Sequence, residues 1–126
     1  MTKPIEEAVD SKSLCDLVVE GMTEKKASEI VVMDLTAVKH AVADFFIICS
    51  GTSDTQIDAI ADSIEEHVRK LSSEKPWRKE GQANREWILI DYVNVVAHVF
   101  NIEKRAFYAL EELWGDAKIE TIDSQN

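Results

Sequence analysis

The sequence predicts an α/β fold: a single domain in which helices pack on a mixed five-stranded sheet. The chain has 126 residues, which is the size of one ordinary domain. Three segments carry apolar residues at helical spacing, and five others are extended or apolar runs of strand length. No internal repeat or linker interrupts the order α-β-β-α-β-β-β-α. We therefore expect one domain over residues 1–126, with a core at about 10–117 and a frayed tail at 118–126.

Each predicted helix has an apolar stripe, and the second and third also have recognisable capping residues. The first spans residues 10–26 and carries Leu14, Val18 and Met22 on one face. In the second, Ser53 and a glutamine three residues later form a capping-box pattern, and an apolar stripe continues to Leu71. The third follows Asn101 and is predicted to end at Gly115, with Phe107 and Trp114 on its apolar stripe.

The predicted strands divide into a buried pair and a more exposed group. Residues 29–35 and 44–50 are nearly continuous apolar runs, which indicates strands covered on both faces, and the second should lie centrally in the sheet. Residues 77–81 resume in extended form after Pro76. Residues 86–92 and 95–100 are separated by two residues, which predicts an antiparallel hairpin.

The charge balance favours a basic partner over nucleic acid. Asp and Glu number 24 against 14 Lys and Arg, giving a formal net charge of -10. Such a field repels phosphate backbones and speeds the encounter with basic proteins, although acidity also serves solubility alone. The two cysteines, Cys15 and Cys49, lack metal-site spacing and are predicted to be buried free thiols. No signal sequence or membrane span is recognisable, so we expect a cytoplasmic protein.

The candidate catalytic groups do not form a recognisable constellation. Residues 50–53 join a strand to a helix N-terminus, where a phosphate could bind, but they lack a Walker lysine and a GxGxxG pattern. Asp54 and Asp58 lie one helical turn apart and could share a metal, but they more simply complement the helix dipole. His98 lies within an apolar strand, where a hydrogen-bonded structural role is more common than base catalysis. We expect no catalytic residue, no metal and no cofactor.

Aromatic residues concentrate in the last two fifths of the chain. Several of them belong to the core, but Trp77 follows a proline in a predicted loop or edge strand, and Tyr108 lies off the stripe of the last helix. Tryptophan, tyrosine and arginine are the usual energetic anchors of protein interfaces. Trp77 and Arg105 are therefore candidate anchors for a partner.

Several ordered motifs resemble the ribosomal silencing factor family, also called the iojap family. They cover nearly the whole domain and comprise EKKASEIVVMDL at 24–35, ADFFIICSGTSDTQIDAIAD at 43–62, Glu80-Gly81, Trp87-x-Leu89-x-Asp91-Tyr92, His98-Val99-Phe100, and Arg105-x-Phe107-Tyr108-x-Leu110-Glu111-x-Leu113-Trp114. The resemblance implies a nucleotidyltransferase-like fold without catalytic carboxylates. It also implies a translational repressor that binds large ribosomal subunit protein fourteen and blocks joining of the small subunit.

A partner-binding surface follows from combining the resemblance with the exposed aromatics. We expect it to comprise Trp77, Asp91, His98, Phe100, Arg105, Tyr108 and Glu111. Little direct contact with ribosomal RNA is expected, and the protein should be a monomer or a weak homodimer. Two alternatives remain: a nucleotidyltransferase-like enzyme that uses residues 50–53 with Asp54 or Asp58, and a homodimeric interaction module.

The chain departs from the family pattern at the hairpin turn. Val93 and Asn94 stand where a Gly-Asp type turn is more usual, and valine resists the positive φ of a type I′ turn, so the turn type stays open. Ala97 replaces a bulkier β-branched residue, a change in volume that should leave binding intact.

Overall fold

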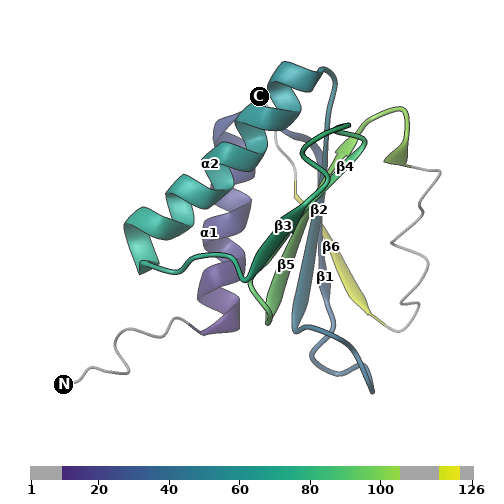
Figure 1. The fold of residues 1–126 in the computed structure, drawn as a ribbon. Coiled ribbons are helices and arrows are strands. Elements are labelled where there is room, and N and C mark those ends of the chain that lie inside the picture. Colours follow the sequence, from purple (N-terminus) through teal and green to yellow (C-terminus); the bar gives the residue numbers. More distant parts are fainter. Residues whose placement is uncertain (1–9, 106–116, 123–126) are drawn as a thin grey trace.

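The computed structural model describes residues 10–105 and 117–122. These residues form a six-stranded mixed sheet with two helices on one face, an arrangement that can be followed in Figure 1. Its elements are α1 (Ser11–Glu24), β1 (Ser28–Asp34), β2 (Phe45–Gly51), α2 (Asp54–Ser72), β3 (Arg78–Glu80), β4 (Trp87–Asp91), β5 (Val95–Asn101) and β6 (Lys118–Ile122). The strand order is β3-β4-β5-β2-β1-β6. Only β2 and β5 pair in parallel, and every other pairing in this sheet is antiparallel.

The predicted α/β class, the central position of β2 and the β4–β5 hairpin are confirmed. The predicted strand count of five is wrong, because Lys118–Ile122 forms a sixth strand instead of a frayed tail. This strand pairs antiparallel with β1, with Val32 opposite Glu120. Its first four residues are exposed, so it lacks the buried periodicity that identifies a strand in a sequence. The backbone edge of β1, rather than apolar burial, orders this segment.

Both helices start at side-chain caps, and the sequence predicts the one at Ser53. The Asp10 carboxylate accepts the Ser13 N–H at the start of α1, and the Ser53 hydroxyl accepts the Gln56 N–H at the start of α2. Gln56 also fastens the two helices together, because its side-chain amide donates to the carbonyls of Lys25 and Lys26, both at 3.2 Å. The predicted third helix, over residues 101–115, lies almost wholly outside the described residues.

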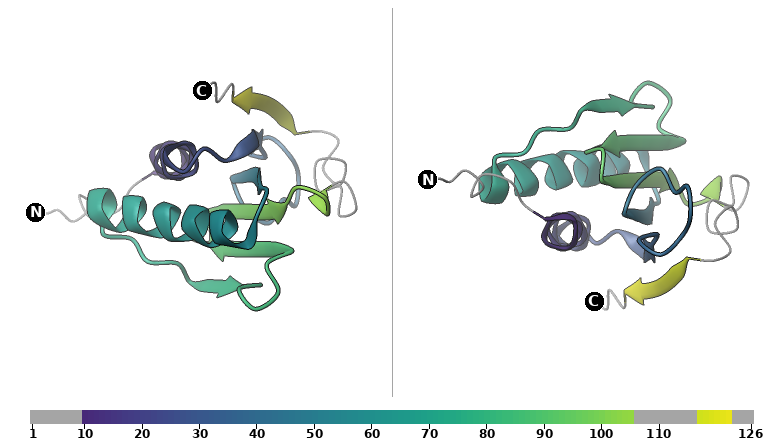
Figure 2. Two further views of the ribbon diagram at one scale, coloured as in Figure 1. Left: turned by 90° about the horizontal axis from the view of Figure 1, so that it is seen from above. Right: turned by 90° about the horizontal axis from the view of Figure 1, so that it is seen from below.

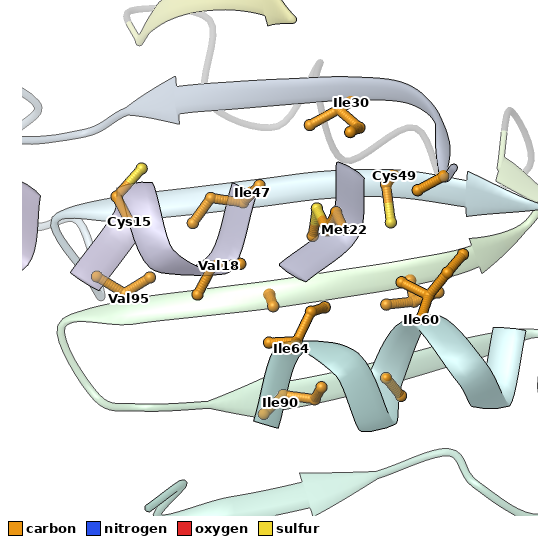
Figure 3. Close-up of a cluster of buried hydrophobic side chains, with 14 of the residues drawn as sticks. Cys15, Val18, Met22, Ile30, Ile47, Cys49, Ile60, Ile64, Ile90 and Val95 are labelled. Carbon is orange, nitrogen blue, oxygen red and sulfur yellow. The ribbon is translucent and has the colours of Figure 1, made fainter. Parts of the chain in front are cut away.

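The helices pack closely on each other and on one face of the sheet (Figure 2). Gly21 permits the close approach, because a Cβ built there would lie 2.8 Å from the Ile64 Cα. The Ser63 hydroxyl donates to the Gly21 carbonyl at 2.8 Å across this contact. Beneath the helices, alternate residues of the central strands form the main core, and ten of its residues are labelled in Figure 3. Among the described residues, neither helix is long and apolar enough to cross a lipid bilayer.

The opposite face of the sheet carries a second apolar cluster. Phe46, Ile48, Val96 and Phe100 belong to it, and residues of the 36–43 loop pack against its edge. Successive side chains of a strand point to opposite faces, so β2 and β5 contribute to both clusters. The helices cover only the first face, and the second therefore depends on other segments or partners for its cover.

Candidate protein-binding site

A hollow of about 430 Å³ lies on the sheet face that the two helices leave uncovered. Its walls come from the 36–43 loop, from β2, from the edge strand β3 and the residue before it, and from the β4–β5 hairpin. The lining residues are Val42, Phe46, Trp77, Arg78, Leu89, Asp91, Val93, Val96 and His98. The structure therefore brings together three of the predicted site residues, Trp77, Asp91 and His98.

The rim of the hollow exposes three large apolar side chains. Trp77 and Val42 are each 69% exposed, and Val93 is 54% exposed. They lie far apart in the sequence and meet only because the sheet brings the loop, the edge strand and the hairpin turn together. Clustered exposed apolar residues with polar neighbours are typical of protein interaction sites. Val42 has no counterpart in the predicted site, since an isolated valine in a loop carries no sequence signal.

Trp77 is held in place by its backbone and by the neighbouring arginine. Its backbone N–H donates to the backbone carbonyl of Asp91 at 2.7 Å, which anchors the start of the edge strand β3 on the hairpin. The Arg78 guanidinium carbon lies 5.4 Å from the centre of the Trp77 ring, within the range of a cation–π contact. The indole is thus positioned before any partner arrives, which lowers the entropy lost on binding.

Asp91 holds the hairpin turn and the edge strand β3 beside the hollow. One carboxylate oxygen accepts the Val93 N–H at 2.8 Å, and the other accepts the Arg78 Nε–H at 3.2 Å. Arg78 also pairs with Glu80 on the edge strand. With both oxygens engaged inside the protein, Asp91 serves as a positioning residue for the turn and for the edge strand.

The hairpin turn holds Val93 in a strained conformation. Its φ is +78°, whereas a positive φ is costly for a β-branched residue. The Asn94 N–H donates to the Tyr92 carbonyl at 3.0 Å, which is the i to i+2 bond of a γ-turn with positive φ. Asn94 is not among the residues with positive φ, so the turn is not type I′. The turn thus places an exposed valine at the rim of the hollow at a cost in backbone strain.

His98 forms part of the hollow's floor within a cluster of aromatic rings. Its ring centre lies 4.8 Å from that of Phe46 and 5.8 Å from that of Trp87. The Trp87 Nε1–H donates to His98 Nδ1 at 2.9 Å. Burial lowers the pKa of His98 from its ordinary 6.5 to about 3, so the imidazole is neutral near pH 7. His98 therefore acts as a neutral polar group and not as a charge.

Two other predicted site residues lie away from the surface. Phe100 is only 1% exposed, and Trp87 stacks on it with the ring centres 5.2 Å apart. Arg105 is 7% exposed, and its guanidinium donates to the Glu29 carbonyl at 2.6 Å and to the Ser50 hydroxyl at 2.9 Å. Arg105 therefore ties the ends of β1 and β2 together instead of anchoring a partner. Tyr108 and Glu111 lie outside the described residues.

The groups considered for catalysis are engaged in structural contacts. The Arg85 Nε lies 2.9 Å from both carboxylate oxygens of Asp58, and a terminal nitrogen of Arg85 lies 4.0 Å from Asp54. Within the described part of the chain, no three His, Cys, Asp or Glu residues are grouped to hold a metal ion. Cys15 and Cys49 are buried free thiols, as predicted, and burial raises the pKa of each to about 12.

Comparisons with known proteins converge on one description. A family model described as "Ribosomal silencing factor during starvation" matches residues 8–126. The ribosomal silencing factor RsfS of Halalkalibacterium halodurans is 38% identical over 109 residues, covering 86% of this chain and 92% of that protein. Its namesake in Bacillus subtilis is 35% identical, covering 91% of this chain and 96% of that protein.

Solved structures show the same fold. A crystal structure of a Chromobacterium violaceum protein aligns with a TM-score of 0.79 and 27% identity, covering 87% of this chain and 90% of that one. A second, from Bacillus halodurans, aligns with a TM-score of 0.73 and 34% identity, covering 89% of this chain and 98% of that one.

Proposed function

Because the chain belongs to the ribosomal silencing factor family, whose members bind ribosomes and are not enzymes, we propose that it represses translation by keeping the ribosomal subunits apart. In this proposal the protein binds large ribosomal subunit protein fourteen and occupies space that the small subunit needs. The observation that carries it is the hollow rimmed by Val42, Trp77 and Val93, a preformed apolar surface on the face that the helices leave uncovered.

The charge of the chain supports a basic ribosomal protein as the partner. A net charge of -10 attracts a basic protein and is repelled by the phosphates of the surrounding ribosomal RNA. Electrostatics then speed the approach, whereas the apolar rim provides the contact area at the surface itself. We accordingly propose an interface made mainly with protein, with little direct contact to ribosomal RNA.

Silencing by this route requires no chemistry. The bound factor excludes the small subunit by its volume, so its effect depends only on its concentration relative to its Kd for the large subunit. We also propose that the fold is related to that of nucleotidyltransferases but holds no catalytic carboxylates, because Arg85 engages both Asp54 and Asp58. An enzymatic function therefore gains no support from these two residues.

The binding surface is tested by titrating large ribosomal subunits with the wild type, Trp77→Ala and Leu71→Ala. Leu71 is a matched control, because it is 62% exposed but lies at the end of α2, outside the hollow. We expect Trp77→Ala to weaken binding by roughly tenfold or more, as for an aromatic anchor, and Leu71→Ala to bind as the wild type does. Equal binding by all three proteins would show that the partner uses another surface.

The same proteins also test whether the hollow instead joins two copies of the chain. Mass measurement across a range of concentrations distinguishes a monomer from a dimer. We propose that the form that binds the large subunit is the monomer. A dimer that dissociates in Trp77→Ala, combined with unchanged binding of that variant to large subunits, would assign the hollow to self-association.

A further inference from the structure

His98, which lines the hollow, carries a hydrogen-bond donor whose position on the ring follows from its neighbour. An indole Nε1–H can only donate, and that of Trp87 lies 2.9 Å from His98 Nδ1. Nδ1 must therefore accept, which in a neutral imidazole places the proton on Nε2. Trp87 thus fixes the tautomer of His98, and the free end of the ring is a donor.

Among the residues that the structure describes, this donor has no acceptor. His98 is 2% exposed, and its Nε2 is buried without a hydrogen-bond partner. A buried polar group in this state costs free energy, and most such groups in folded proteins are paired. Because His98 also lines the hollow, a small displacement of the side chains that cover Nε2 would bring it within reach of a group that enters the hollow.

The other polar groups near the floor do not compete for this donor. The carboxylate of Asp91 is committed to the Val93 N–H and to the Arg78 Nε–H. The Arg78 guanidinium is itself paired with Asp91 and Glu80. Most of the remaining wall is apolar, formed by residues such as Phe46, Leu89 and Val96. An occupant therefore meets mainly apolar walls.

Resting on the proposed function, we propose that the hollow receives an apolar side chain of the ribosomal partner, and that a neutral carbonyl beside it accepts the His98 Nε2–H. A lysine or arginine head group would place a donor against this donor and would lose its hydration without gaining a bond. A carboxylate would be repelled by Asp91, and the Arg78 guanidinium beside it is already shared between Asp91 and Glu80. The hollow thus selects an uncharged segment, even on a basic partner.

The neutral state of His98 makes this contact insensitive to pH in the physiological range. Its pKa of about 3 lies far below that range, so the donor does not change its charge between pH 6 and 8. The recognition depends on the direction of a hydrogen bond rather than on a titrating charge.

The proposal is tested by measuring the Kd for purified large ribosomal subunits with His98→Phe, which keeps a ring but removes the donor. The partner's carbonyl would then be buried unpaired, so we expect binding to weaken by roughly fivefold to a hundredfold. Trp87→Phe is the companion variant: it frees Nδ1 and allows the other tautomer, so we expect it to weaken binding while leaving the imidazole in place. Thermal unfolding confirms that each variant is folded.

A measurement on the wild type avoids any effect of substitution on folding. In the free protein, nitrogen NMR of His98 should show a bare Nδ1 and a protonated Nε2. On binding isolated large-subunit protein fourteen, the Nε2–H resonance should move downfield as the hydrogen bond forms. A protonated Nδ1, or an Nε2–H resonance that binding leaves unmoved, would overturn the proposal.

The outcomes separate this inference from the proposed function. If the wild type binds large subunits and folded His98→Phe binds with the same Kd, the hydrogen bond is absent while the silencing function stands. If the wild type itself does not bind large subunits, the proposed function and this inference fall together.

Discussion

Replacing Val93 with glycine should stabilise the protein and weaken its binding at the same time. Val93 has a φ of +78° and is 54% exposed, so its side chain adds strain to the turn and contributes little to the core. Strain of this kind costs about 1–3 kcal/mol. Glycine removes it but adds about 0.4–1 kcal/mol of chain entropy to the unfolded state. The net gain in the free energy of unfolding should be about 0.5–2 kcal/mol.

Both effects of Val93→Gly are large enough to measure. For a chain of 126 residues, the entropy of unfolding predicts roughly 4 °C in Tm per kcal/mol, so Tm should rise by about 2–8 °C. Binding should weaken about fivefold, because covering the exposed half of a valine side chain contributes about 1 kcal/mol. Calorimetry or thermal circular dichroism gives the first quantity, and titration of large ribosomal subunits gives the second.

Ser73→Gly is a matched control for the backbone effect. Ser73 also has a left-handed φ, of +63°, but it caps the end of α2 and does not line the hollow. The control should gain stability without any loss of binding. The reasoning is refuted if Val93→Gly fails to raise Tm, or if both variants lose affinity to the same extent.

Three further predictions concern the scaffold and its titrating groups. Gly21→Ala should lower the free energy of unfolding in urea by about 1–3 kcal/mol, because the added methyl lies 2.8 Å from the Ile64 Cα; an unchanged midpoint would contradict this packing. Between pH 6.5 and 3 the unfolded chain binds a proton at His98 that the folded protein excludes. As the pH is lowered through this range, the free energy of unfolding should therefore fall by up to about 1.4 kcal/mol per pH unit, and it should fall less steeply in folded His98→Phe. Burial raises the pKa of Cys15 and Cys49 from 9.0 to about 12, so the free energy of unfolding should fall as the pH rises through this range. Prompt reaction of either thiol in the folded protein with a disulfide reagent near pH 8 would disprove their burial.

The elements that the sequence predicts best are those with long apolar periodicity. The stripe of α2 and the continuous run of β2 repeat over enough residues to define both the element and its burial. The edge strand Lys118–Ile122 could not be found in this way, because four of its five residues are exposed and its order comes from backbone pairing with β1. Edge strands of this kind are specified by their neighbours.

Sequence reasoning named three residues that the structure brings together and two that it buries away from the hollow. Trp77, Asp91 and His98 do line one hollow, but Phe100, two residues beyond His98 on the same strand face, is covered by Trp87. Arginine is a residue type that often anchors interfaces, but Arg105 is buried and donates hydrogen bonds to Glu29 and Ser50. Strand alternation predicts the face that a side chain occupies, whereas its exposure depends on which distant segment lies above it.

The central claim, that this protein keeps ribosomal subunits apart, is tested most directly by subunit joining in sucrose gradients. Purified small and large subunits are combined with increasing amounts of the wild type, with Trp77→Ala as the variant of reduced affinity. Exclusion predicts that the joined-ribosome peak declines as the large subunit becomes occupied, and that Trp77→Ala requires roughly tenfold more protein for the same decline. An undiminished joined peak, with the wild type shown to be bound to the large subunits, would contradict the proposed mechanism.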